Sequence, residues 1–140
     1  MDAFDADVLI YASVPDHPLG RRVRELFPSE PTAVTGAVAG IGSVLLIPEL
    51  LTKPLRDNMQ PELEALTILL ARLDLRPTDE AVAQLAAALG AAYGLRAADA
   101  VHLATAVSAG ADRFFTNNSS DFTRAITEID VIYPQDLPEL

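Results

Sequence analysis

The feature that most constrains the fold of this chain is the alternation of short apolar runs with longer segments of helical character. The longer segments are rich in Ala and Leu, and several begin at Asp or Pro and end at Gly. Short strands separated by helices are typical of an α/β domain with a mainly parallel sheet. We expect helices at residues 16–27 (with Asp16 as N-cap), 48–55, 61–70, 81–93 and 98–109, and strands at residues 8–11, 41–43, 73–76, 113–116 and 130–133.

Length and composition indicate one domain without thiol chemistry. A chain of 140 residues forms a single core, so we expect one α/β/α domain spanning residues 1–140, with four or five short strands in a central sheet. The absence of Cys excludes disulfides, zinc–thiolate sites and thiol nucleophiles. The acidic N-terminus differs from a basic secretory signal, and we expect a cytoplasmic protein that does not enter membranes.

The charge balance of the chain is strongly acidic. Twenty Asp and Glu residues against ten Lys and Arg residues give a formal net charge of −10. Such a chain does not bind nucleic acid through its overall charge. Two interpretations stay open: the carboxylates form a solubilising surface, or some of them converge on a metal ion that reverses the local field.

Four carboxylates lie in apolar sequence contexts near the ends of expected elements. Asp5 lies at the start of the first apolar strand, Glu49 in the first turns of a helix, Asp99 at the start of the helix at 98–109, and Asp121 shortly after the strand at 113–116. Buried carboxylates need compensation, and the carboxyl ends of parallel strands form a common crevice. Ligation by oxygen alone selects a hard cation, Mg²⁺ or Mn²⁺.

These segments resemble the PIN domain family over essentially the whole chain, and most of all the VapC-type toxins of bacterial toxin–antitoxin pairs. The resemblance implies a three-layer α/β/α PIN-like fold and an endoribonuclease that depends on Mg²⁺ or Mn²⁺ and cleaves RNA with metal-activated water. It also implies a homodimer and a cognate VapB-like antitoxin as partner. The segments that carry it are Asp5 near the N-terminus, Ser43-Val-Leu-Leu-Ile-Pro-Glu49-Leu, Asp99-Ala-Val-His-Leu-Ala-Thr-Ala and Phe115-Thr-Asn-Asn-Ser-Ser-Asp121-Phe. The catalytic and metal-binding residues that it implies are Asp5, Glu49, Asp99 and Asp121.

Two positions depart from the family's pattern. Many relatives place an acid two residues after the Thr that corresponds to Thr116, where this chain has Asn118, and we therefore assign the fourth acid to Asp121. Asp7 stands where a small hydroxyl or amide residue is more common, and it either adds a ligand or hydrogen-bonds the loop after the first strand. Thr116 either orients a ligand or water, or only ends a strand.

Each candidate also has a purely structural interpretation. Asp99 complements a helix dipole in that view, Glu49 forms an ion pair with Lys53 four residues later, and Asp121 caps a short helix. His102 lies one turn after Asp99 and is either a packed helix residue or a general base. If the acids do cluster, we expect at least one of them to have a raised pKa without metal.

Two other functions remain as alternatives. Asp5 and Asp7 fit the Asp-x-Asp motif of a haloacid-dehalogenase-like phosphatase, although Lys53 is the only Lys and the chain is short for that fold. A non-cleaving PIN-like scaffold that binds RNA or protein is the second. An RNA substrate requires basic contacts, for which the candidates are Arg21, Arg22, Arg24, Lys53, Arg56, Arg96 and Arg124.

Overall fold

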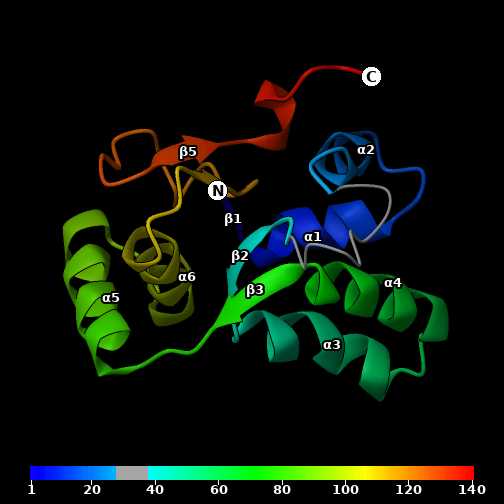
Figure 1. The fold of residues 1–140 in the computed structure, drawn as a ribbon, viewed down its shortest axis with the longest axis horizontal. Helices are drawn as coiled ribbons and strands as arrows, with labels where there is room; N and C mark the ends of the chain where they lie inside the picture. Colours follow the sequence, from blue (N-terminus) through cyan, green and yellow to red (C-terminus); the bar gives the residue numbers. More distant parts are fainter. Residues whose placement is uncertain (28–37) are drawn as a thin grey trace.

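A five-stranded parallel sheet lies at the centre of the computed structural model, which describes residues 1–27 and 38–140 (Figure 1). The strand order is β3-β2-β1-β4-β5, and each neighbouring pair is parallel. This arrangement confirms the expected α/β/α class with its central parallel sheet. The strands are β1 (Asp2–Phe4), β2 (Gly40–Ser43), β3 (Leu73–Arg76), β4 (Arg113–Phe115) and β5 (Asp130–Ile132).

Helices cover both faces of the sheet, and alternate strand residues supply the two cores between the layers. Ala3 and Phe114 pack toward α5 and α6, whereas Phe4 and Phe115 pack toward the other helices. This alternation follows from the two-residue period of a strand. The helices are α1 (Ala6–Ser13), α2 (Pro18–Arg24), α3 (Leu46–Arg56), α4 (Gln60–Ala71), α5 (Glu80–Tyr93) and α6 (Ala97–Ser108), followed by a 3₁₀ turn, η1 (Pro134–Asp136).

The strand expected at residues 8–11 is wrong, because these residues belong to helix α1. The first strand is instead the short segment β1, which ends just before Asp5. Val8, Leu9 and Ala12 are buried while Ile10 is 39% exposed, which is the pattern of a helix with one buried face. Asp5 accepts a hydrogen bond from the N–H of Ala6 and so caps this helix.

The second helix also begins differently from the expectation. Asp16 is not its N-cap; His17 is, with Nδ1 accepting a hydrogen bond from the N–H of Gly20 at 3.1 Å. Helices α1 and α2 approach closely here, since a Cβ on Gly20 would lie 1.9 Å from the carbonyl oxygen of Tyr11. The short α2 therefore depends on a residue without a side chain.

The remaining elements lie within a few residues of their expected positions. Asp79 caps α5 through a 2.9 Å hydrogen bond from the N–H of Val82, and Gly94 ends it in the left-handed conformation with φ of 66°. The capping Asp and the terminal Gly are the sequence signals from which we predicted the bounds of this helix.

No single helix within residues 1–27 and 38–140 is long and apolar enough to span a membrane. Among these residues, α5 and α6 are long and apolar enough only when taken together, and the two helices are bent by 114° relative to each other.

Candidate functional site

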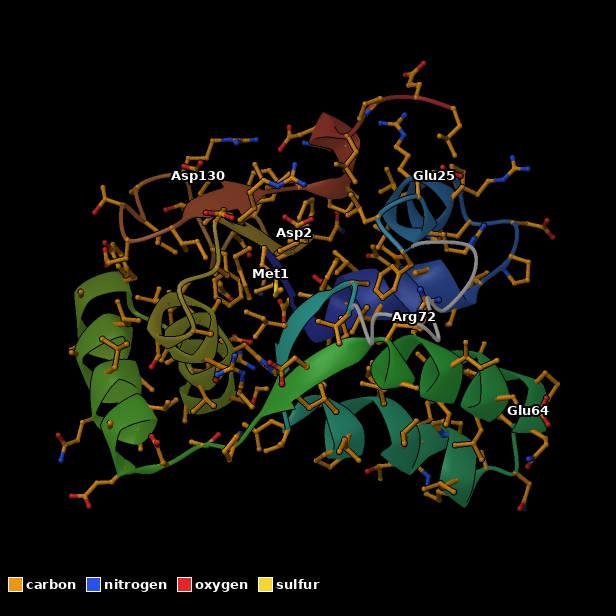
Figure 2. The ribbon with its side chains drawn as sticks, viewed as in Figure 1. Met1, Asp2, Glu25, Glu64, Arg72 and Asp130 are labelled. Carbon is orange, nitrogen blue, oxygen red and sulfur yellow. The ribbon has the colours of Figure 1, made fainter. Side chains whose placement is uncertain are left out.

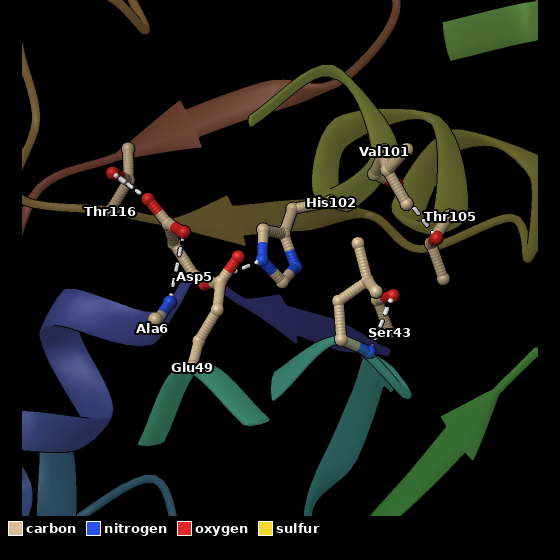
Figure 3. Close-up of polar contacts among 9 residues, drawn as sticks. Asp5, Ala6, Ser43, Glu49, Val101, His102, Thr105 and Thr116 are labelled. Carbon is tan, nitrogen blue, oxygen red and sulfur yellow. Dashed lines mark hydrogen bonds and ion pairs between the residues drawn. The ribbon is translucent and has the colours of Figure 1, made fainter. Parts of the chain in front are cut away.

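The candidate site begins where the two central strands end. Phe4 and Phe115 are paired in the register of β1 and β4, so Asp5 and Thr116 leave the sheet side by side. The Thr116 hydroxyl donates to Asp5 Oδ2 at 2.8 Å, and both side chains are buried (Figure 3). Asp5 therefore lies at the carboxyl end of β1, and not at the start of an apolar strand as expected.

Hydrogen bonds of its backbone N–H and of both carboxylate oxygens fix the position of Asp5. Its N–H donates to the carbonyl of Phe115 at 2.9 Å, and its Oδ1 accepts from the N–H of Ala6 at 2.8 Å. Burial raises the pKa of Asp5, and repulsion from Glu49 adds to this, against the opposing effects of His102, the Thr116 hydroxyl and the backbone N–H of Ala6. A rigid carboxylate that resists ionisation is thus fixed at the edge of the sheet.

Asp7 lies beside Asp5 in the first turn of α1. Its Oδ2 accepts a 3.0 Å hydrogen bond from the N–H of Asn117, whereas its Oδ1 is buried without a hydrogen-bond partner among the described residues. Burial, followed by repulsion from Asp5, raises the pKa of Asp7 to about 6. We expected Asp7 to add a ligand or to hydrogen-bond the loop after the first strand; its hydrogen bond goes instead to the loop after β4.

Asp99 adds a carboxylate from helix α6 to the same site. It lies in the first turn of α6 and is half-buried. Burial raises the pKa of Asp99, and repulsion from Asp5, Asp121 and Glu49 raises it further. The expected upward shift is thus present, with burial as a larger cause than the repulsion between acids on which the expectation was based.

Glu49 contacts His102 and not Lys53. Its Oε2 lies 3.0 Å from His102 Nε2, and the ion pair expected with Lys53 is not present among the described residues (Figure 3). Burial lowers the pKa of His102, but the hydrogen bond to Glu49 and the charges of Glu49, Asp5 and Asp99 outweigh it, so that its pKa is raised. His102 was expected to be a packed helix residue or a general base; it is buried and also bonded to a site carboxylate. Its position three residues after Asp99 places it one turn along the same helix, but no local sequence signal pairs it with Glu49.

Asn118 and Asp121 form one hydrogen-bonded unit in the loop after β4. Asn118 Nδ2 donates to Asp121 Oδ2 at 2.8 Å, and the N–H of Asn118 donates to Thr116 Oγ1 at 3.1 Å. Within residues 38–140 no helix begins at Asp121, so the expected capping role is absent. The unit is tied through Thr116 to Asp5.

These five acids form what we call the acidic cluster: Asp5, Asp7, Glu49, Asp99 and Asp121. Their charges act on one another, although in the described part of the chain no three His, Asp or Glu side chains stand ready to hold a metal ion. The donors are nevertheless all oxygens, and Asp7 Oδ1 is buried without a partner. The chemistry of these donors is that of ligands to a hard divalent cation.

Part of the negative charge lies on the outer surface, as expected if the carboxylates solubilise the protein. Glu25, Glu64 and Asp130 are exposed and lie on the outside of the molecule (Figure 2). The net charge therefore comes both from the outer surface and from the cluster.

The fold and the acidic cluster define an α/β domain with carboxylates gathered at the carboxyl edge of its parallel sheet. The chain belongs to the PIN domain family, whose model matches residues 3–126. PIN domains are nucleases, which supports hydrolysis of nucleic acid as the class of activity. Because the chain belongs to the PIN domain family, the alternative of a haloacid-dehalogenase-like phosphatase is wrong.

Three solved structures share this fold. A toxin–antitoxin complex from Klebsiella pneumoniae is similar over 100% of both chains, with a TM-score of 0.71 and 22% identity. VapBC2 from Rickettsia felis, bound to a DNA fragment from its promoter, matches 94% of this chain and 97% of its own, with a TM-score of 0.68 and 16% identity. VapBC-1 from nontypeable Haemophilus influenzae matches 96% of this chain and 98% of its own, with a TM-score of 0.66 and 17% identity. A comparison with curated protein sequences gives no match.

Proposed function

We propose that this chain is an endoribonuclease that depends on Mg²⁺ or Mn²⁺ and is the toxin of a VapBC-type toxin–antitoxin pair. In this proposal residues 1–140 act as a single PIN domain in the cytoplasm. The observation that carries it is the acidic cluster at the carboxyl edge of a PIN-fold sheet, in which burial and mutual repulsion raise the pKa of Asp5, Asp7 and Asp99. Such a cluster is costly unless a cation binds there.

Asp5 and Asp99 are the proposed direct metal ligands, completed by Glu49 and Asp121. When bound, a divalent cation offsets the charge that develops on a phosphodiester and lowers the pKa of the attacking water. Thr116 fixes the orientation of Asp5 through their 2.8 Å hydrogen bond, and Asn118 holds Asp121 beside them. Asp7, with one oxygen free of protein partners in the described residues, supports the site.

The basic side chains supply a contact for the substrate backbone. Most are occupied: Arg22, Arg24, Arg56, Arg76, Arg113 and Arg124 contact carbonyl, carboxylate or ring groups, and Arg72 also has a partner. The side chains of Arg21, Lys53 and Arg96 form no hydrogen bond or ion pair with residues 1–27 or 38–140.

Two of these three unpaired cations lie beside the acidic cluster. Lys53 is one turn beyond Glu49 on α3, and Arg96 is the N-cap of α6, one turn before Asp99. We propose that they bind phosphates of single-stranded or looped RNA on either side of the cluster, which the net charge of −10 does not attract by itself.

A cationic antitoxin segment is the proposed inhibitor. Arg inserted among Asp5, Glu49 and Asp99 would pair with their oxygens through charge-assisted hydrogen bonds and take the place of the metal. The similar solved structures are toxin–antitoxin complexes, which supports such a partner. We also propose a homodimer, as expected for the VapC-type toxins.

The test is cleavage of labelled single-stranded RNA by the purified protein with Mg²⁺, with Mn²⁺ and with EDTA. Cleavage is expected only with metal, and Asp5→Asn and Asp99→Asn are expected to abolish it. Asp130→Asn, which removes an exposed carboxylate from β5, is the matched control and is expected to retain activity. Equal cleavage in EDTA would refute metal dependence, and RNA binding without cleavage would establish the scaffold alternative.

A further inference from the structure

We propose that His102 is a positioning residue that holds the Glu49 carboxylate in the orientation needed to complete the metal site. This inference rests on the proposed function, because it assumes that the acidic cluster binds a divalent cation. It concerns a residue of α6 that the four-carboxylate description leaves out.

The imidazole of His102 connects helix α6 on one face of the sheet with helix α3 on the other. Its side chain is 1% exposed and extends from α6, and its Nε2 donates to Glu49 Oε2 of α3 at 3.0 Å. Figure 3 shows the ring beside both Glu49 and Asp5, from the α6 side of the site. The contact therefore joins elements that lie on opposite faces of the sheet.

Glu49 depends on this contact for its orientation. Its side chain is 34% exposed, and within the described residues it makes no hydrogen bond or ion pair except the one with His102. A long carboxylate side chain without a partner samples several rotamers, and ordering it costs entropy when a metal binds. The imidazole removes part of that cost before the metal arrives.

Packing alone does not explain a His at this position. Most buried positions of α6 are apolar, with Leu103, Ala104 and Ala106 in the core, and the hydroxyl of buried Thr105 bonds back to the helix's own Val101 carbonyl. His102 Nδ1 is buried and has no hydrogen-bond partner among the described residues, which costs stability that a Leu would not. The structure thus carries a buried polar ring whose one hydrogen bond goes to a site carboxylate.

The experiment is a calorimetric titration of the protein with Mn²⁺, which needs no catalytic turnover. Loss of a hydrogen-bond partner of a ligand typically weakens metal affinity about 10- to 100-fold, and we expect this for His102→Leu. His102→Gln is expected to stay within about threefold of wild type, since its amide N–H replaces the Nε2 donor. Circular dichroism checks that each variant folds, and His102→Asn, whose amide is too short to reach Glu49, takes the place of His102→Leu if that variant unfolds.

A double-mutant cycle tests whether the effect passes through Glu49. Glu49→Gln weakens Mn²⁺ binding, and adding the His102 substitution is expected to change the affinity by less than about twofold. Thr105→Val is the control, because it removes another buried polar group of α6, whose one hydrogen bond within the described residues goes to the Val101 carbonyl. Wild-type affinity in His102→Leu or His102→Asn, equal losses in these variants and His102→Gln, or an additive cycle would overturn the positioning role alone. Absence of Mn²⁺ binding by the wild type would overturn the proposed function together with it.

Discussion

Replacing Asp7 by Asn is expected to stabilise the metal-free protein at pH 8 and to change its stability little at pH 4. Burial and the charge of Asp5 raise the pKa of Asp7 from its ordinary 3.8 to about 6 in the folded chain. Between these two values the folded state binds more protons than the unfolded state, so stability falls as the pH rises, and the full cost is present above pH 6. An Asn removes the charge and keeps an oxygen that accepts from the N–H of Asn117.

The size of the effect follows from the difference between the two pKa values. Two pH units correspond to about 3 kcal/mol at most, and solvent access to this partly buried side chain reduces the gain to about 1–3 kcal/mol. For a domain of this length each kcal/mol moves the melting temperature by about 3 °C, so the increase at pH 8 is about 3–9 °C.

Thermal unfolding by circular dichroism in EDTA at pH 4, 6 and 8 measures this gain. Asp130→Asn on the exposed surface of β5 is the control and is expected to shift the melting temperature by less than about 2 °C. A lower melting temperature for Asp7→Asn at pH 8, or an equal increase at pH 4 and pH 8, would refute the assignment of a strained, buried charge to Asp7.

Three further outcomes are expected. Mn²⁺ at about 100 times its dissociation constant stabilises the wild type by about 2.7 kcal/mol and leaves Asp5→Asn/Asp99→Asn unchanged in a thermal shift assay; an equal shift in both would contradict a metal site at these acids. In an Asp5→Asn background, Lys53→Ala with Arg96→Ala weakens single-stranded RNA binding and reduces the slope of log affinity against log salt by about 1.4, whereas Arg21→Ala does neither; equal slopes in a salt titration would exclude the phosphate contacts. Gly20→Ala lowers the free energy of unfolding by about 2–3 kcal/mol in a urea titration, because its Cβ collides with the Tyr11 carbonyl, and an unchanged midpoint would show that α1 and α2 separate easily.

Local signals predicted most of the fold and failed where two signals competed. The capping Asp79 and the left-handed Gly94 identify α5 because both act within one turn of the chain. The run of residues 8–11 is apolar throughout, so its composition suggests a buried strand, whereas the burial of Val8, Leu9 and Ala12 has helical spacing. A three-residue strand such as β1 carries too little pattern to be found without its neighbours in the sheet.

The acids of the site were predictable as types and positions, but their partners were not. The bond between Glu49 and His102 joins residues 53 positions apart, and no local pattern pairs them. Lys53, the partner that helical spacing suggests for Glu49, instead has none among the described residues, because the carboxylate turns toward α6. The choice between Asn118 and Asp121 stays a prediction, since the two side chains are bonded to each other.

Because β1 lies at the centre of the sheet, the candidate site depends on residues that are synthesised far apart in time. Asp5 precedes its hydrogen-bond donor Thr116 by 111 residues, and β1 has β4 as one of its two neighbours in the sheet. At roughly 5–20 residues per second, a ribosome adds Thr116 about 6–22 seconds after Asp5. A translation product that ends before Thr116 therefore lacks the hydrogen-bond donor of Asp5 and the loop that carries Asp121. For the ribonuclease proposed here, activity therefore waits until the segment from Thr116 to Asp121 has been made and has folded against β1.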